Sequence, residues 1–420
     1  MQHAKQVEIL KELIAGLDSH STVDAGSIVI NPASTYTDAA LAETEWQAFF
    51  QNHPQVLALS GELPGPGSYL TIDDFGLPIL ATRDQNGRFR AFVNACRHRG
   101  AQLTGEARGT QARFTCPFHG WTYSGDGRLM GIREAEHFGH IDKACHGLVE
   151  LPSAEKYGLL MVHPQVGATL DVDALLGDVG EEIAAWELDK CEYLGESILD
   201  QPLNWKIAND TFGEIYHFKT LHKDTLSNLF HGDIATYKEF GRHHRICLAS
   251  KYLDVLRQQP EANWCLADAG VAAYYLFPNI QIVIFNRVIA FVRIYPDRHN
   301  PGRSLSRVGH YSARHVASHV QDTAPVEEIT GETLYAADTS TRVEFNLSTQ
   351  LELLVSTVEQ EDYYMGTKTQ LAADSGKVDY FLFGRNEPAL HHFHNNYRAA
   401  LGMPPLETYH AGAAPASPAR

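Results

Sequence analysis

The segment from Asn204 to His222, NWKIANDTFGEIYHFKTLH, brings a carboxylate and two imidazoles close together at Glu214, His217 and His222. Glu214 and His217 are three positions apart, so on a helix they lie on one face. His217 and His222 are five apart, about 140° around an ideal helix. Both reach one centre only if the helix ends, kinks or carries a π-bulge there. Two imidazoles suit iron, zinc, copper or nickel, and a carboxylate from elsewhere would complete a 2-His-1-carboxylate face. In a chain with 22 histidines, the alternative is an amphipathic helix with two surface histidines.

A second set of candidate ligands lies upstream, in CRHRG at 96–100 and CPFHGW at 116–121. Each segment offers one thiolate and one imidazole, from Cys96 and His98 and from Cys116 and His119. These donors could hold tetrahedral zinc, although zinc-finger loops usually pair like ligands with like. A Rieske [2Fe–2S] cluster needs two cysteines on one iron and two histidines on the other. The mixed loops satisfy that need directly, so the pattern favours this one-electron carrier.

The composition is that of an ordinary globular protein, and 420 residues allow two or three domains. A formal net charge of −17 argues against nucleic acid or an anionic membrane as a partner. No run approaches the roughly 18 apolar residues of a membrane span. Residues 1–20 are typical of an amphipathic helix, not a signal peptide. Six cysteines are too few for a disulfide framework, which indicates a reducing compartment, the cytoplasm.

The pattern along the chain divides it into four parts. Residues 1–44 form an N-terminal helical segment that we expect to pack on the catalytic domain. Residues 45–165 read as a small antiparallel β domain, with short strands at 69–72, 78–83 and 89–94 and a turn at 84–87. Residues 166–410 continue with acidic helices near 172–188 and strands at 193–199, 274–277, 281–286, 288–294 and 306–312. Residues 411–420 are predicted to be a disordered tail.

The two ligand motifs in this order resemble the catalytic α subunit of Rieske non-haem iron oxygenases, the aromatic ring-hydroxylating dioxygenase family. The resemblance covers nearly the whole chain. It implies an α+β fold in which a small antiparallel Rieske domain is inserted before a helix-grip (START/Bet v1-like) catalytic domain with a long antiparallel sheet. It also implies two cofactors, a [2Fe–2S] cluster held by Cys96, His98, Cys116 and His119 and a mononuclear Fe(II).

The third iron ligand should come from the late segment VSTVEQEDY at 355–363. By similarity to the family's Glu-Asp-aromatic pattern, Asp362 joins His217 and His222 as the ligand. Glu359 and Glu361 are rival candidates, and an acidic helix face is the alternative without a metal.

The resemblance also implies a role for Glu214, namely a link from His217 to His119 of the neighbouring subunit in a homotrimer. The family more often has Asp at this position. A Glu at this position resembles the branch of the family that oxidises quaternary ammonium substrates such as carnitine. The sequence has no P-loop and no G-x-G-x-x-G after a strand, so we expect electrons from a separate reductase, directly or through a ferredoxin.

The implied function is that of a terminal oxygenase that uses O2 to hydroxylate a small organic substrate, in the first place an aromatic ring. Such trimers occur with or without a small β subunit, and the sequence does not decide between them. Three alternatives stay open: a quaternary ammonium monooxygenase, a non-catalytic electron-transfer protein and a zinc-binding scaffold.

Other residues carry weaker expectations. Five strand residues either line an apolar pocket or belong to the core: Tyr275, Phe277, Ile282, Ile284 and Phe291. The histidines at 243–244 have no partners at ligand spacing, so we expect them at the surface. The histidines within 391–394 lie near the tail, and we expect them at the surface as well.

Overall fold

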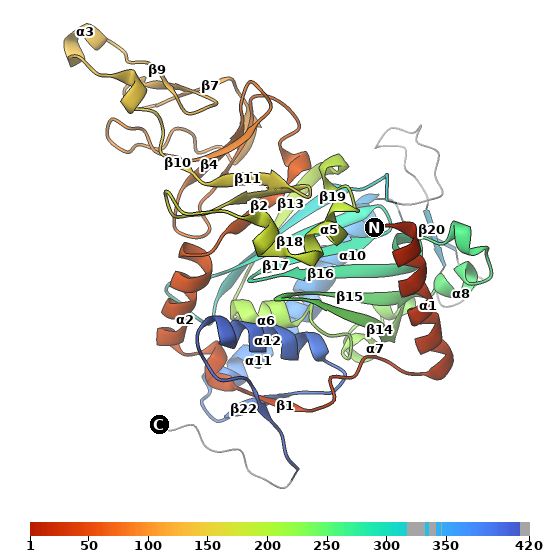
Figure 1. Cartoon of the computed structure of the whole chain (residues 1–420). Coiled ribbons are helices and arrows are strands. Elements are labelled where there is room, and N and C mark those ends of the chain that lie inside the picture. Colours follow the sequence, from red (N-terminus) through yellow and green to blue (C-terminus); the bar gives the residue numbers. More distant parts are fainter. Residues whose placement is uncertain (317–331, 336–341, 346, 412–420) are drawn as a thin grey trace. The chain divides into compact units, whose positions relative to one another are not determined.

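The computed structural model describes residues 1–316, 332–335, 342–345 and 347–411 (Figure 1). The chain divides into two compact domains. The first, called here the β-domain, comprises residues 47–175 and 187–191, and the second, the large domain, comprises 1–46, 176–186 and 192–420. The β-domain thus extends past the expected limit of 165 and includes a short later segment. Most of the tail expected at 411–420 lies outside the described residues.

Short antiparallel strands build the β-domain. They are β2 (Gln55–Leu59), β3 (Ser68–Ile72), β4 (Ile79–Arg83), β5 (Phe89–Val93), β6 (Arg108–Thr110), β7 (Arg113–Thr115), β8 (Thr122–Ser124), β9 (Leu129–Gly131), β10 (Glu150–Leu151), β11 (Ser153–Lys156) and β12 (Leu159–Val162). Their sheets have the orders β10-β5-β4-β3-β6, β11-β12-β2 and β7-β8-β9. The expected turn at 84–87 is closed by Asp84, whose carboxylate accepts from the backbone N–H groups of Asn86 and Arg88.

One seven-stranded antiparallel sheet forms the centre of the large domain, in the order β13-β19-β18-β17-β16-β15-β14. Its strands are β13 (Glu192–Gln201), β14 (Phe230–Phe240), β15 (His243–Ser250), β16 (Gly270–Leu276), β17 (Ile280–Phe285), β18 (Val288–Pro296) and β19 (Ser304–Ser312). The sheet contains all five strands expected between 193 and 312. The prediction of an α+β fold with antiparallel sheets is confirmed.

Helices pack on both faces of this sheet. The helices of the large domain include α1 (His3–Ser19), α2 (Ala39–Glu45), α5 (Asp178–Ala184), α6 (Trp205–Asp210), α7 (Phe218–Leu221), α10 (Leu347–Thr357), the π-helix η9 (Val358–Tyr363), α11 (Tyr364–Asp374) and α12 (Pro388–Ala400). On one face, Tyr274 of β16 donates a hydrogen bond to Glu182 of α5. On the other face, Gln281 of β17 donates to Asn209 of α6 at 2.9 Å. Helix α1 runs beside β14 and β15 (Figure 1).

A buried ion pair anchors α6. Lys206 and Glu45 are both about 1% exposed, and Lys206 Nζ lies 2.6 Å from Glu45 Oε1. The Trp205 indole donates to the second carboxylate oxygen at 2.7 Å, and the Tyr397 hydroxyl also donates to Glu45. Removing one partner of such a buried pair costs about 3–5 kcal/mol, because the other charge is left uncompensated. The beginning of the NWK segment is therefore tied to α2 and α12.

The histidines expected at the surface are buried, so that prediction was wrong. They lie where α12 packs on the sheet, and their rings have polar partners. His392 Nε2 donates to the Gly241 carbonyl at 2.8 Å, and His392 Nδ1 lies 3.2 Å from His244 Nδ1. His394 Nε2 donates to Asp210 at 2.9 Å. Burial lowers the pKa of His244 and of His392, which favours the neutral form of both rings. Also buried are His243 and His391.

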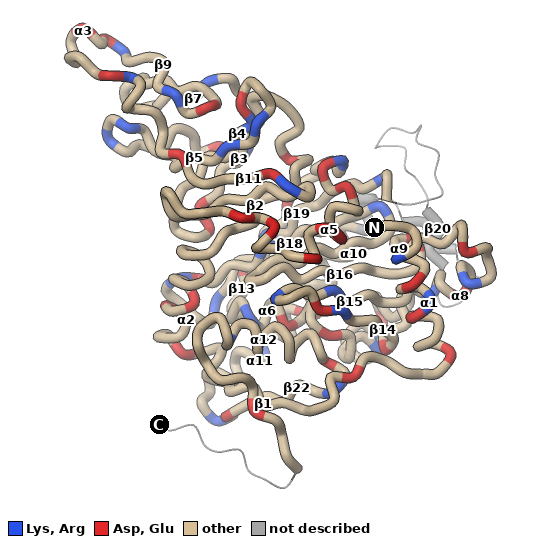
Figure 2. The backbone as a smooth tube through the Cα atoms, viewed as in Figure 1, with Lys and Arg blue, Asp and Glu red and all other residues tan. Residues whose placement is uncertain are grey.

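Charged residues of both signs are interspersed along each domain (Figure 2). The net charge of −17 is therefore not confined to one segment of the chain. Within the described ranges, no helix combines the length and the apolar character that crossing a bilayer requires.

Candidate functional site: two metal centres and a cavity

The two cysteine–histidine loops of the β-domain have the same local backbone. The Gly100 N–H donates to the Cys96 carbonyl at 2.8 Å, and the Gly120 N–H donates to the Cys116 carbonyl at 3.0 Å. Both glycines have a positive φ, 75° and 73°, which a residue with a Cβ adopts only at a cost. The glycine four residues after each cysteine thus lets the chain turn back close to the histidine.

The donor side chains of the two loops lie close together. The rings of His98 and His119 have centroids 4.6 Å apart, and Cys96 and Cys116 are buried. The buried Nδ1 atom of each histidine has no hydrogen-bond partner. Desolvation, followed by the charges of His98 and Arg99, lowers the pKa of His119, which favours the neutral ring that binds metal. Two thiols and two unpartnered ring nitrogens match the donors of a Rieske [2Fe–2S] cluster, so these residues fit that group.

Neighbouring aromatic side chains complete this centre. The Tyr123 hydroxyl lies 3.3 Å from Cys96 Sγ and accepts a hydrogen bond from the Arg97 N–H at 3.0 Å. Since the backbone donates to its oxygen, the hydroxyl proton is available to the sulfur, and hydrogen bonds to the sulfurs tune the potential of a cluster. Trp121 stacks on His98 at a centroid distance of 5.3 Å. Phe118, beside His119, is 55% exposed, so this end of the domain presents an aromatic surface.

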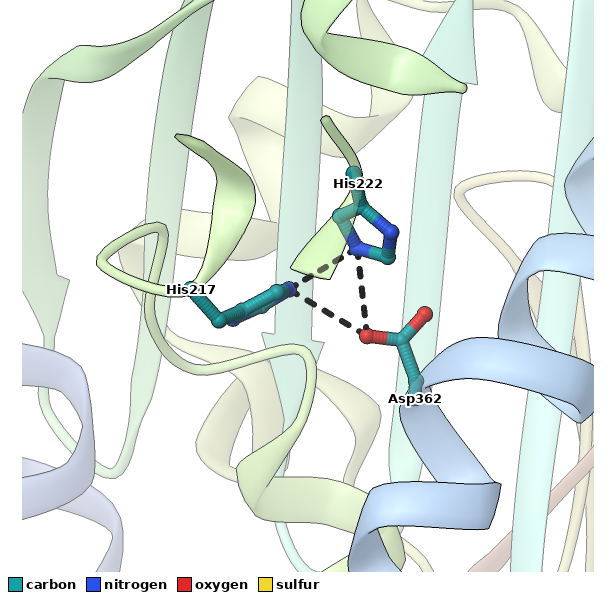
Figure 3. Close-up of side chains that lie close together, drawn as sticks. All are labelled: His217, His222 and Asp362. Atoms are coloured by element: carbon teal, nitrogen blue, oxygen red, sulfur yellow. Dashed lines mark hydrogen bonds and ion pairs between the residues drawn. The ribbon is translucent and has the colours of Figure 1, made fainter. Parts of the chain in front are cut away.

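In the large domain, His217 and His222 stand at the two ends of α7. His217 precedes its first residue and His222 follows its last, so the helix ends at both candidate ligands. Their Nε2 atoms lie 3.0 Å apart, and Asp362 Oδ1 lies 3.2 and 3.3 Å from them (Figure 3). Three cis ligands of an octahedron, each about 2.1 Å from a metal, are about 3.0 Å apart. The triangle therefore fits one ion, and two histidines with one carboxylate are typical of non-haem Fe(II).

Each imidazole meets a second carboxylate at its other ring nitrogen. His217 Nδ1 donates to Glu214, whose other oxygen accepts from the His217 backbone N–H at 3.1 Å. His222 Nδ1 donates to Glu361 Oε2 at 2.7 Å. Burial alone lowers the pKa of His217, but Asp362 and Glu214 outweigh it and raise this pKa to about 10. A metal ion that bound His217 would therefore displace a proton from it.

Asp362 belongs to the π-helix η9, which interrupts the run of α10 into α11. The sequence suggested a π-bulge as one way to bring the two histidines together, whereas the structure has its π-turn beneath the carboxylate. Such turns favour functional sites. Of the two rival carboxylates, Glu359 is exposed with its Oε1 at 3.4 Å from the Gln201 amide, and Glu361 contacts His222 Nδ1. Only Asp362 of the three reaches both Nε2 atoms.

A cavity of about 150 Å³ adjoins these ligands. Its polar lining residues are Thr211, Glu214, His217, His222 and Asp362, and the other described lining side chains are apolar. The Thr211 hydroxyl donates to the Ala208 carbonyl at 2.9 Å, so its proton is already engaged. Aromatic members of the lining are Phe212, Phe218, Phe230 and Phe285.

The cavity lies on the face of β17 opposite to Ile282 and Ile284, which were pocket candidates from the sequence. Val283 and Phe285 line it, whereas Ile282 and Ile284 alternate with them and point to the other face of the sheet. Phe291 pairs with Ile282 and shares that other face. Tyr275 and Phe277 are not among the described lining residues either. The period of two was visible in the sequence, but the choice of face was not.

Comparisons with known proteins identify one family for each of the two parts of the chain that contain these residues. The family described as "Ring hydroxylating alpha subunit (catalytic domain)" matches residues 182–403. The family described as "Rieske [2Fe-2S] domain" matches residues 53–148. Among solved structures, a quaternary ammonium Rieske monooxygenase, CntA, in complex with L-carnitine has a TM-score of 0.69 at 19% identity, over 89% of this chain and 95% of that one. Naphthalene 1,2-dioxygenase from Rhodococcus sp. has a TM-score of 0.67 at 17% identity, over 94% and 98%. These likenesses show the fold.

Curated relatives come from two substrate classes. The oxygenase subunit of glycine betaine monooxygenase from Chromohalobacter salexigens is 31% identical over 204 residues, 48% of this chain and 45% of the relative. The large subunit of anthranilate 1,2-dioxygenase from Acinetobacter baylyi is 32% identical over 204 residues, 47% of this chain and 43% of the relative. The chain thus spans about half the length of the curated relatives it matches. The catalytic-domain family covers more than half of the chain, and the protein therefore belongs to the ring-hydroxylating alpha subunits, with a Rieske domain ahead of the catalytic domain.

Proposed function

We propose that the protein is a terminal oxygenase that takes electrons from a separate reductase, directly or through a ferredoxin, and uses O2 to hydroxylate a small organic substrate. The supporting observation is the pair of donor sets with different chemistry in one chain. Two thiols with two imidazoles suit a one-electron carrier. Two imidazoles with one carboxylate leave coordination positions open beside a cavity. When bound, the mononuclear iron supplies O2 activation, and the cluster supplies an electron.

The protein's own groups prepare this site. His217, His222 and Asp362 present their donor atoms on one side, toward the cavity. Glu214 accepts from the Nδ1–H of His217, which leaves Nε2 of that ring free to ligate. The apolar lining excludes water and positions the substrate against the open side of the centre.

The cavity favours an uncharged, largely apolar substrate. An apolar cavity of roughly 150 Å³ is large enough for a benzene ring, which matches the volume beside the ligands. The donors of the described lining are already engaged, Thr211 with the Ala208 carbonyl and the two imidazole N–H groups with Glu214 and Glu361, so a substrate carboxylate there would lose its hydration without gaining a protein donor. The proposed substrate is therefore a single aromatic ring without a carboxylate. Unlike glycine betaine and anthranilate, the substrates named for two relatives, it carries no charged group.

Glu214 is proposed as the electron link between two subunits of a homotrimer. Its carboxylate holds His217 Nδ1, and its side chain is 15% exposed, so one edge stays accessible. Tyr216, next but one in the chain, is 73% exposed. His119 of the neighbouring subunit is the imidazole that we expect on the other side of this carboxylate.

The first prediction tests the cluster. Cys116→Ala removes a buried thiolate donor, so the [2Fe–2S] centre should not assemble and the visible and electron-resonance spectra should be lost. Cys145→Ala is the matched control, because Cys145 is exposed in the same domain. A Cys116→Ala protein with the spectrum of the wild type would exclude this assignment. Colourless wild-type protein containing zinc would favour the scaffold alternative.

The second prediction tests the mononuclear site. Asp362→Ala should reduce iron from about three to about two per chain and abolish hydroxylation, while the cluster spectrum persists. Glu359→Ala should keep both iron and activity, because Glu359 is exposed and faces Gln201. Iron analysis with turnover by a surrogate reductase makes the measurement. Loss of iron in Glu359→Ala, with retention in Asp362→Ala, would show that the wrong carboxylate has been assigned.

The third prediction concerns the substrate. Toluene and benzoate have similar ring size but differ in charge, so the kcat/KM for toluene should exceed that for benzoate at least about tenfold, since an unpaired buried charge costs several kcal/mol. Val283→Phe should weaken toluene binding by filling the cavity, as calorimetry would measure. Coupled oxidation of benzoate, carnitine or glycine betaine in preference to toluene would contradict the substrate proposal and leave the oxygenase proposal standing.

The fourth prediction tests the link between subunits. Glu214→Gln keeps the size of the side chain and removes its charge, so product formation should fall by about 10- to 100-fold or more while the cluster stays reducible and most iron is retained. In a single turnover, a pre-reduced cluster should remain reduced after O2 and substrate are added.

Subunit mixing supplies the geometric part of this test. Oligomers that combine Glu214→Ala chains with Cys116→Ala chains contain interfaces where an intact cluster meets an intact iron site. Such mixtures should regain activity that neither parent has. If hetero-oligomers form and no activity returns, electron transfer occurs within one chain.

A further inference from the structure

The hydrogen bonds around His222 indicate a role for Glu361, a residue to which the proposed function gives none. His222 is 1% exposed, and both of its ring nitrogens meet carboxylates of η9. Nε2 lies 3.3 Å from Asp362 Oδ1, and Nδ1 donates to Glu361 Oε2 at 2.7 Å. Two consecutive residues thus hold the two nitrogens of one imidazole.

These two contacts with His222 depend on the irregular turn of η9. On a regular α-helix, consecutive side chains point about 100° apart, so two neighbouring residues seldom contact the same imidazole ring. Here Asp362 reaches Nε2 and Glu361 reaches the other nitrogen of the same ring. The π-turn that places Asp362 at the metal site therefore also places Glu361.

Glu361 is itself held in position. The same oxygen that accepts from His222 also accepts from the Thr225 hydroxyl at 3.0 Å. Thr225 follows α7 closely, and its backbone N–H donates to the His222 carbonyl at 3.1 Å. His222, Thr225 and Glu361 thus form a closed set of hydrogen bonds between the segment after α7 and the π-helix.

The chemistry of imidazole shows what this set accomplishes. A neutral ring has one N–H and one lone pair, and the acceptor beside one nitrogen decides where the proton sits. A carboxylate at Nδ1 keeps the proton there, fixes the plane of the ring and increases the basicity of Nε2. Without it, a buried ring is free to rotate or to change tautomer.

We propose that Glu361, braced by Thr225, is the positioning residue that holds His222 as an Nε2 metal ligand. This inference rests on the proposed function, because it concerns the same iron site. The roles of the two flanking carboxylates differ. Glu214 serves the less buried His217, whose ring is 17% exposed, whereas Glu361 serves the enclosed His222.

Cobalt(II) binding tests this role without turnover, since the absorption of the Co(II) site reports both affinity and ligand geometry. Glu361→Ala should bind Co(II) about 10- to 100-fold more weakly, with a shifted visible band. Glu361→Gln keeps an acceptor for Nδ1 and should lose less, and Thr225→Val should lose less than Glu361→Ala. Glu359→Gln is the matched control from the same helix and should bind as the wild type does.

The outcomes separate this inference from the proposed function. If Glu361→Ala binds Co(II) with wild-type affinity and band position while Asp362→Ala loses it, Glu361 does not position the ligand, and the oxygenase proposal stands. If the wild type binds no Co(II) at this site and carries no cluster, the proposed function itself fails. A folded Glu361→Gln protein, verified by circular dichroism, keeps the comparison valid should Glu361→Ala fail to fold.

Discussion

The candidate metal site depends on holding three donor atoms within 3.3 Å of one another. Two imidazole nitrogens and a carboxylate oxygen do not gather so closely on their own, because each is better solvated by water and a carboxylate in a poorly hydrated site is costly. The surrounding scaffold must therefore be rigid. Two features of the backbone place the donors: α7 begins after His217 and ends before His222, and a π-turn contains Asp362.

The rigidity is propagated from the core of the large domain. The Lys206–Glu45 pair and the Gln281–Asn209 hydrogen bond attach α6 to α2 and to the central sheet. The chain leaves α6 a few residues before Glu214, so the position of that carboxylate follows from the anchoring of α6. An apolar cavity beside a polar centre then results from strand alternation, because Val283 and Phe285 present the apolar side of β17 to the ligands.

Local patterns in the sequence predicted much of this arrangement. Cys96, His98, Cys116 and His119 lie in two short motifs, and alternation marks the strands. Properties set by distant contacts were harder to predict. Glu361 gains its role only from His222, far away in the chain, and an acidic neighbour of a ligand looks like any solvated glutamate. His392 and His394 resemble surface residues until α12 is known to pack on the sheet. The face of β17 that lines the cavity depends on register against neighbouring strands.

The two histidines of the candidate metal site differ in burial. His222 is enclosed and its second nitrogen is occupied by Glu361, so the ring offers no outward contact. His217 is partly exposed, and the carboxylate at its second nitrogen is partly exposed as well. Of the two carboxylates that hold these rings, Glu361 is 23% exposed and Glu214 is 15% exposed, so burial distinguishes the two imidazoles and not the two carboxylates. The enclosed His222 ring is therefore fixed by packing as well as by its carboxylate, whereas the less buried His217 ring depends more on the hydrogen bond to its carboxylate.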